Sequence, residues 1–130
     1  MASTMVSLLI RPRTPTGTSL WATEKVFELL LDDSIISDVA KRKLAYRKAR
    51  GLCDAGFRLH MPEGVKREYG KTYRIRIDQY RIVGFFDRDY RNFIAVDFFI
   101  KKTQKNDSRM AAIYQKVDAI REAGTWIRSE

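Results

Sequence analysis

Two arginines alternate with apolar residues in the middle of the chain. Tyr73, Ile75 and Ile77 fall on one side of a period of two, and Arg74 and Arg76 fall on the other. This period is typical of a half-buried strand whose outer face carries the arginines. A guanidinium stays charged and binds two phosphate oxygens at once. The pattern therefore indicates either a site for an anion or an ordinary solvated face.

The sequence contains few residues that could support metal or thiol chemistry. Cys53 and His60 are the single cysteine and the single histidine, too few for a zinc site built from these residue types. One cysteine forms no intramolecular disulfide, which fits a reducing, cytoplasmic environment. We expect Cys53 to be a small buried hydrophobe near a helix end and His60 to lie on the surface or in a loop. We expect no metal and no cofactor.

The charge of the chain is basic and unevenly distributed. Its 130 residues contain 25 Lys and Arg against 16 Asp and Glu, a formal net charge of +9. Residues 1–40 sum to −2 and residues 110–130 to zero, whereas residues 41–109 sum to +11. Such an excess predicts an acidic partner, with nucleic acid or an anionic membrane surface as candidates. No apolar run approaches the roughly 18–20 residues that cross a bilayer, so we expect a soluble cytoplasmic protein without a membrane role.

The strand that carries Arg74 and Arg76 must be held in place by the rest of the fold. The length of the chain favours a single domain over residues 1–130. Seven Phe, six Tyr and two Trp supply the apolar mass for a core. Periodicity and capping residues predict a strand at 6–10, a loop at 11–18, helices at about 23–31 and 34–53, strands at 73–77, 80–86 and 93–100, and a last helix at about 108–123.

This order predicts an α+β fold. The three strands after the helices would form a meander in a small, mostly antiparallel sheet, and the helices would pack on one face. The opposite face would then carry Arg74 and Arg76, with Arg81 beside them. A sheet face lined with arginines suits an anion better than it suits a core.

Residues 66–120 resemble the RelE/HigB-type toxins of type II toxin–antitoxin systems, in particular the HigB and phage-derived branch of the RelE superfamily. The segment Tyr73-Arg74-Ile75-Arg76-Ile77, followed by Tyr80-Arg81-Ile82-Val83, is similar to the family's strand core, and Lys101-Lys102-Thr103-Gln104-Lys105 is similar to the basic box that closes its sheet. The tract at 66–70 lies where members have a basic, glycine-containing segment. The resemblance implies a RelE-like fold, with two N-terminal helices on one face of the sheet and a C-terminal helix.

The same resemblance implies an mRNA endoribonuclease. Members cleave mRNA without a metal ion, usually in the ribosomal A site, which inhibits translation, and a cognate antitoxin protein neutralises them. Cleavage would use the ribose 2′-OH as the nucleophile on the adjacent phosphate. On the family pattern the catalytic residues would be Arg74, Arg76, Arg81, Lys101 and Lys102. The expected RNA contacts are Lys66, Arg67, Lys71, Lys105 and Tyr114.

The second predicted helix carries a further basic cluster that includes Lys41, Arg42 and Arg47. This cluster is either a solvated helix face or a surface that docks ribosomal RNA through its phosphates.

The general base stays open at this point. Arginine is a poor base because its pKa exceeds about 12, and this chain carries arginines where some members carry lysines. Lys101, Lys102, His60 or a ribosomal group could take the proton, and Asp97 could orient an arginine. Two other interpretations remain: a non-catalytic module of the same fold that binds RNA or a protein, and a nucleic-acid-binding domain outside the family.

Overall fold

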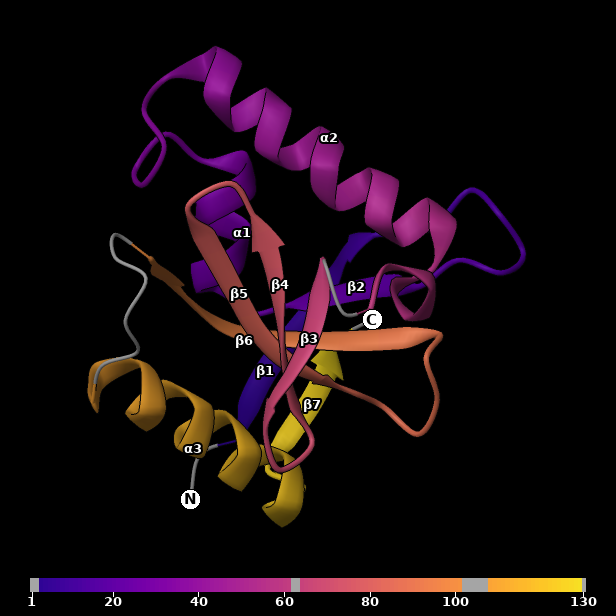
Figure 1. Ribbon diagram of the computed structural model, residues 1–130, viewed down its shortest axis with the longest axis vertical. Helices are drawn as coiled ribbons and strands as arrows, with labels where there is room; N and C mark the ends of the chain where they lie inside the picture. Colours follow the sequence, from indigo (N-terminus) through magenta and orange to yellow (C-terminus); the bar gives the residue numbers. More distant parts are fainter. Residues whose placement is uncertain (1–2, 62–63, 102–107, 130) are drawn as a thin grey trace.

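Strands lie at both ends of the described chain. The computed structural model describes residues 3–61, 64–101 and 108–129. Its elements follow in the order β1 (Thr4–Ile10), β2 (Ser19–Ala22), α1 (Glu24–Leu31), α2 (Val39–Ala55), the 3-10 helix η1 (Phe57–His60), β3 (Val65–Tyr69), β4 (Thr72–Ile77), β5 (Tyr80–Phe86), β6 (Asn92–Ile100), α3 (Ser108–Ala123) and β7 (Trp126–Ser129) (Figure 1).

The seven strands of the described residues form one mixed sheet with the order β3-β4-β5-β6-β2-β1-β7. β3 to β6 make an antiparallel meander, and β1 pairs antiparallel with β2. Two parallel pairings, β2 with β6 and β1 with β7, complete the sheet. The fold is α+β, but the expectation of a RelE-like fold is wrong. The sheet is larger and mixed, two strands precede the first helix, and a strand follows the last one.

Three short strands that the sequence pattern missed account for this difference. β2, β3 and β7 have the sequences SLWA, VKREY and WIRS, none with a clear apolar alternation. β2 and β7 owe their places to distant partners, since Ser19 pairs with Asn92 and Thr4 pairs with Trp126. Pairing of this kind is set by the tertiary fold, so a local pattern does not reveal it.

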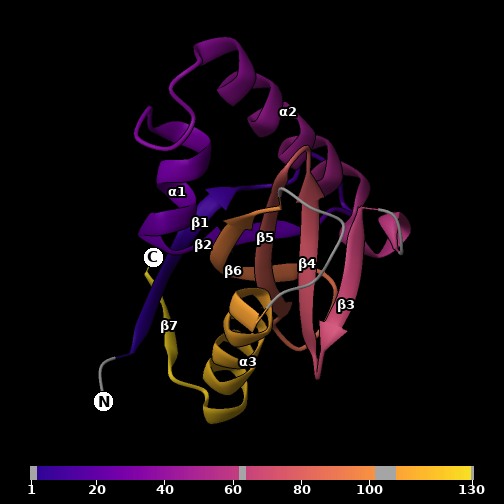
Figure 2. The same cartoon turned by 60° about the vertical axis from the view of Figure 1, so that its left-hand side comes forward.

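Helices cover both faces of the sheet, with a separate core on each. α1 and α2 pack over the face that carries Ile75. α3 packs on the other face, where Val117 joins Val83, and Figure 2 shows α3 well separated from α1 and α2. Side chains alternate along a strand, so Arg74 and Arg76 lie on the α3 face. The expectation that the helices share one face and leave the arginine face open is therefore wrong.

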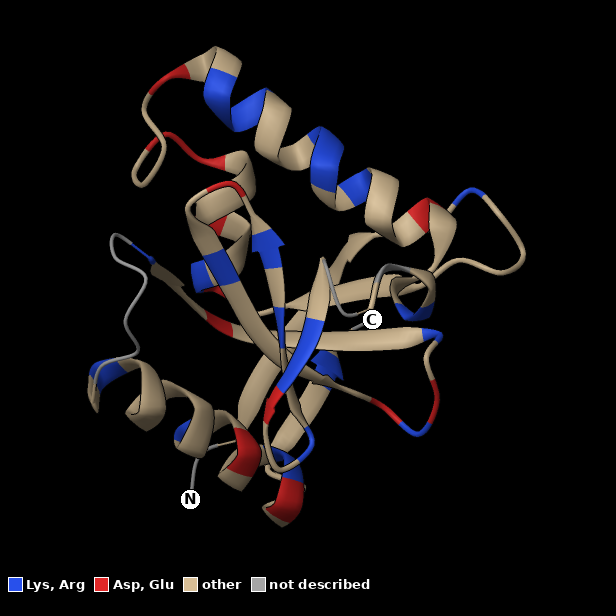
Figure 3. Cartoon of the chain, in the orientation of Figure 1, with Lys and Arg blue, Asp and Glu red and all other residues tan. Residues whose placement is uncertain are grey.

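α2 begins at Val39 rather than at about residue 34. The Asp38 carboxylate accepts a hydrogen bond from the Lys41 N–H at 3.1 Å, the N-cap interaction that starts a helix here. The helix ends at Gly56, whose φ of +93° favours glycine. Basic residues recur along α2 between these ends (Figure 3).

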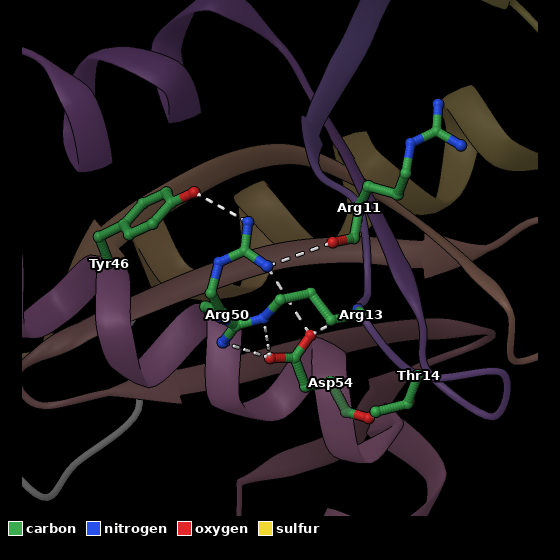
Figure 4. A network of polar contacts seen from close by, with 6 residues as sticks. All are labelled: Arg11, Arg13, Thr14, Tyr46, Arg50 and Asp54. Atoms are coloured by element: carbon green, nitrogen blue, oxygen red, sulfur yellow. Dashed lines mark hydrogen bonds and ion pairs between the residues drawn. The ribbon is translucent and has the colours of Figure 1, made fainter.

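Asp54 fixes the long loop between β1 and β2 to α2 (Figure 4). Its carboxylate accepts hydrogen bonds from the backbone N–H and from Nη2 of Arg13, both at 2.8 Å. Arg50 Nη1 approaches the same carboxylate at 3.7 Å, and Thr14 Oγ1 donates to the Asp54 carbonyl. The hydrogen bonds from Arg13 hold the pKa of Asp54 below its ordinary value. The loop at 11–18 is thus tied to the helix by its own arginine.

Candidate functional site

A cavity of about 240 Å³ lies between the sheet and the first half of α3. We call it the cationic cavity. Strands β3, β4, β5 and β6, the residue after β6, and α3 supply its lining: Lys66, Glu68, Arg74, Arg81, Phe99, Lys101, Met110 and Tyr114. Four of these eight side chains are cationic and one is acidic. The cavity therefore offers a concave, positively charged surface of a size that suits a small anionic group.

Arg74 is a largely buried cation of the cavity, and its guanidinium is paired with an acidic side chain. β3 and β4 pair Lys66 with Arg74, which brings Glu68 within reach of the same guanidinium. Arg74 Nε donates to Glu68 Oε1 at 3.0 Å, and the two side chains are only 14% and 18% exposed. Arg74 Nη1 is buried and has no hydrogen-bond acceptor among the described residues. A buried donor without an acceptor is costly, and a ligand oxygen could satisfy this nitrogen once a neighbouring side chain moves aside.

Arg81 adds a second guanidinium to the cavity. It lies opposite Arg76 in the β4–β5 pairing, and its Nη1 donates to the carbonyl oxygen of Asp78 at 2.6 Å. Burial and then the positive charges of Arg74 and Arg76 lower the pKa of Arg81 from its ordinary value. Three guanidinium groups so close together repel one another, so an anion would be stabilised among them.

Tyr114 closes the cavity from α3. Its side chain is 7% exposed, and its ring contacts Phe99 edge-on with centroids 5.9 Å apart. Burial, together with the negative charge of Glu68, raises the pKa of Tyr114 to about 12. The phenol is therefore protonated at neutral pH and can donate a hydrogen bond.

The structure brings together five of the residues that the sequence nominates. Lys66, Arg74, Arg81, Lys101 and Tyr114 all line the cationic cavity. Arg76 lies beside Arg81 but does not line it. Arg67 and Lys71 line a different cavity. Lys102 and Lys105 lie outside the described residues.

The basic cluster of the second helix lies across the sheet from the cationic cavity. Lys41 and Arg47 are exposed positions of α2, which packs on the opposite face. Arg42 is partly engaged in the fold, because its Nη1 donates to the Ile36 carbonyl at 2.7 Å. These three residues therefore form a surface separate from the cavity.

Glu68 is a cavity residue that the sequence did not nominate. It lies two residues after Lys66, so the two side chains share a face of β3. Only the pairing of β3 with β4 puts it beside Arg74. The glycine at position 70, with φ of +55°, marks the turn of this hairpin and is the one signal in the sequence that could have suggested the pairing.

Asp97, which the sequence suggested as a partner for an arginine, binds two lysines instead. Its side chain is 3% exposed and contacts Lys25 Nζ at 2.5 Å and Lys116 Nζ at 2.8 Å. The expectation for Cys53 is confirmed, since the residue is fully buried and burial raises the pKa of its thiol to about 12. His60 falls in η1, and its side chain lies outside what the structure describes.

The described residues contain neither a candidate metal site nor a candidate membrane-spanning helix. No three or more His, Cys, Asp or Glu side chains among residues 3–61, 64–101 and 108–129 are grouped so that they could hold a metal ion. None of the helices in those ranges has the length and apolar character that crossing a membrane requires. In comparisons with known proteins, the chain matches no protein-family model and no curated protein.

Proposed function

We propose that the cationic cavity binds a phosphate of an RNA chain and that the protein cleaves the chain there without a metal ion. The observation that carries the proposal is Arg74 Nη1, a buried guanidinium nitrogen with no acceptor among the described residues. Lys66, Arg81 and Lys101 line the same small cavity. A phosphate oxygen would satisfy the buried nitrogen, and the surrounding cations would stabilise its charge.

The cavity also offers groups for the chemistry. The ribose 2′-oxygen would form a bond to phosphorus while the bond from phosphorus to the 5′-oxygen breaks, which leaves a 2′,3′-cyclic phosphate and a 5′-hydroxyl. Arg74 and Arg81 would stabilise the added negative charge on the phosphate oxygens. Glu68 would accept the proton of the 2′-hydroxyl, and the protonated phenol of Tyr114 would donate one to the leaving 5′-oxygen. Solvent would then return the proton from Glu68 to Tyr114.

One contact favours a second function, RNA binding without cleavage. Glu68 already accepts a hydrogen bond from Arg74, so the carboxylate of the cavity is engaged in an ion pair before RNA arrives. If the pair persists in the complex, the cavity binds a phosphate but lacks a free base. The two functions differ in one observable, the appearance of new RNA ends.

A cleavage assay in the presence of EDTA tests the proposal. The purified protein is mixed with a single-stranded RNA, and the products are examined for 2′,3′-cyclic phosphate ends. Removing one donor to the developing charge typically costs about 10²–10³ in rate, so we expect Arg81→Ala to lose that much. Glu68→Gln should lose activity by a similar factor while it still binds RNA. Arg76→Ala is the matched control on the same strand pair and should keep most of the activity.

Intact RNA after incubation with a folded wild-type protein that binds it would favour the binding function. Equal rates for wild type, Arg81→Ala and Glu68→Gln would contradict the assignment of the site, because the cleavage would then come from elsewhere.

In the cell, we infer that this activity makes the protein a toxin of a toxin–antitoxin pair that cuts mRNA on the ribosome and is neutralised by a partner protein. The inference rests on the cavity and on the motifs at 73–83 and 101–105, and it does not need the RelE-like fold. Expression should arrest growth and create new 5′ ends in mRNA, and Arg74→Ala combined with Arg81→Ala should relieve both. Continued arrest by the folded double variant would contradict the role of this cavity.

A further inference from the structure

A second and larger cavity, of about 530 Å³, lies at the other end of α3. The turn between β3 and β4, the loop between β5 and β6, the last turns of α3 and the start of β7 enclose it. We call it the aromatic cavity. Its volume falls in the range of sites for small organic ligands, about 300–1,000 Å³. The function proposed for the cationic cavity makes no use of it.

Aromatic rings held in fixed contact form one wall of this cavity. Phe86 contacts Tyr73 and Tyr90 edge-on, with ring centroids 5.0 and 4.7 Å apart. Burial, and then the neighbouring Tyr90, raise the pKa of Tyr73 from its ordinary value. Tyr90 is 39% exposed, and Trp126 completes the ring set from β7. Rings that are fixed but accessible are what a nucleobase needs for stacking.

Four cationic side chains also line this cavity, and Arg121 is the one of them that has an ion-pair partner among the described residues, Asp118. Arg67, Lys71 and Arg88 are exposed, and none of these side chains has an ion-pair partner among the described residues. The two carboxylates of the lining are engaged elsewhere: Asp87 approaches Arg128 at 3.7 Å, and Asp89 accepts the backbone N–H of Arg91 at 2.9 Å. The free charge at this cavity is therefore positive.

A ring wall beside free cations matches the chemistry of a nucleotide, which joins a flat base to a phosphate. We propose that the aromatic cavity binds a nucleotide of single-stranded RNA that flanks the phosphate held in the cationic cavity. The base stacks at Tyr90, where it competes with the Arg58 guanidinium that lies 5.2 Å from the ring centroid, and its phosphate lies at Arg67 and Lys71. This inference rests on the proposed function, because it assigns the same RNA chain to both cavities.

Two elements connect the cavities and support a single bound chain. On the edge strand β3, Lys66 and Glu68 line the cationic cavity, while Arg67, which pairs with Tyr73 on the other face, lines the aromatic one, so an RNA chain that reaches both passes around this edge. On α3, Tyr114 lines the first and Arg121 the second, seven residues apart. At 1.5 Å per residue this is a separation of about 10 Å along the helix. An RNA of a few nucleotides is long enough to reach both.

Fluorescence of Trp126 provides a direct test. Trp21→Phe removes the other tryptophan, and the probe is an RNA hexanucleotide carrying 2′-O-methyl groups, which binds but lacks the nucleophile for cleavage. We expect the hexanucleotide to quench Trp126. Tyr90→Leu should weaken binding about tenfold, and Arg67→Ala with Lys71→Ala should weaken it comparably. Tyr69→Leu is the matched control, because Tyr69 is similarly exposed at 46% but lines neither cavity.

Two further ligands identify the source of the nucleotide. Adenosine 5′-monophosphate and inorganic phosphate are titrated against the same protein. A much lower affinity for the mononucleotide than for the hexanucleotide, measured by quenching of Trp126, supports an RNA chain as the ligand. Equal affinity for the two would overturn that assignment in favour of a free nucleotide. Unchanged hexanucleotide binding by both Tyr90→Leu and the Arg67 and Lys71 double variant would overturn the inference, and circular dichroism checks that each variant is folded.

The two proposals fail in different ways. If the wild type cuts RNA but the variants of the aromatic cavity bind the hexanucleotide normally, this inference alone is wrong. If Tyr90 and Arg67 govern binding but no RNA is cut, the cleavage proposal alone is wrong.

Discussion

Asp97 shows how a single backbone irregularity decides what a residue does. Val83 pairs with Asp97 while Gly84 pairs with Ala95, so β6 contains an extra residue at Val96. This bulge leaves both Val96 and Asp97 near α3, since Val96 joins the core under α3 and Asp97 contacts Lys116. Lys25 of α1 reaches the same carboxylate. One buried acid thus links helices on both sides of the sheet.

Asp97→Asn should destabilise the fold in a way that depends on pH. Burial acts to raise the pKa of Asp97, but hydrogen bonds from Lys116, Lys25 and the Phe98 N–H outweigh it and hold the pKa below its ordinary value. The stabilisation is therefore complete above the unfolded pKa of about 4 and is lost as pH falls through the lower folded pKa. Urea unfolding should give a loss of about 1–3 kcal/mol at pH 7 that shrinks towards pH 3.

Asp33→Asn provides the control for this measurement, because Asp33 is exposed and its carboxylate accepts no hydrogen bond from the described residues. We expect it to change stability little at either pH. A loss for Asp97→Asn that stays constant from pH 7 to pH 3 would contradict the titration of Asp97 as its cause.

At the level of single residues, the sequence predicted part of the cationic cavity. Arg74 and Arg81 could be predicted because they lie in strands whose alternation puts a charged residue on the face opposite the apolar ones. Glu68 could not be predicted in this way, because its role depends on its neighbour across the β3–β4 pair. The local alternation of residues does not reveal which strands pair. The lysine partners of Asp97 escape the sequence for the same reason, since they come from helices on different faces of the sheet.

Among the elements, β5 and β6 approach each other so closely at Gly84 that there is no room for a side chain. A Cβ on Gly84 would lie 2.0 Å from the carbonyl oxygen of Ile94, in the partner strand. Gly84→Ala should therefore push the central strands apart and lower the free energy of unfolding by about 1–3 kcal/mol or more. Gly51→Ala is the matched control in α2, where a Cβ would meet no atom within 4 Å. It should raise stability by about 0.5–1 kcal/mol, as alanine does in a helix.

Thermal and urea unfolding of the two variants measure this difference in sign. A neutral Gly84→Ala would mean that β5 and β6 can separate without cost. It would also mean that the bulge beside Gly84 does not hold Asp97 in place.

The predictable elements are those whose own residues carry a period. β4, β5, β6 and α3 lie close to the ranges expected from alternation or from the helical stripe of Met110, Ile113, Val117 and Ile120. β2, β3 and β7 carry no such period, and two of them exist through parallel pairing with remote strands. Missing them turned a mixed seven-stranded sheet into a small, mostly antiparallel one, which agreed with the RelE-like fold that the resemblance of residues 66–120 had implied.

Across the whole molecule, the basic excess divides between two surfaces. One is the surface of the cationic and aromatic cavities, which gather arginines and lysines from β3, β4 and β5. The other is the outer side of α2, which lies beyond the opposite core (Figure 3). The net charge of +9 therefore does not describe a uniform coat. A short RNA that occupies the cavities would not touch α2, whereas a ribosome is large enough to contact both surfaces.

Salt dependence separates these two surfaces. For a single strand, the logarithm of the binding constant falls with the logarithm of salt concentration by about 0.7 per phosphate neutralised. Because Arg67 and Lys71 contact one phosphate, Arg67→Ala with Lys71→Ala should therefore make the slope for the 2′-O-methyl hexanucleotide shallower by about 0.7. Lys41→Ala with Arg47→Ala removes the same charge from α2 and should leave that slope unchanged, while it weakens cosedimentation with ribosomes. A slope that responds to the α2 variant and not to the cavity variant would place the RNA on α2, because counterion release reports only the cations that the phosphates reach.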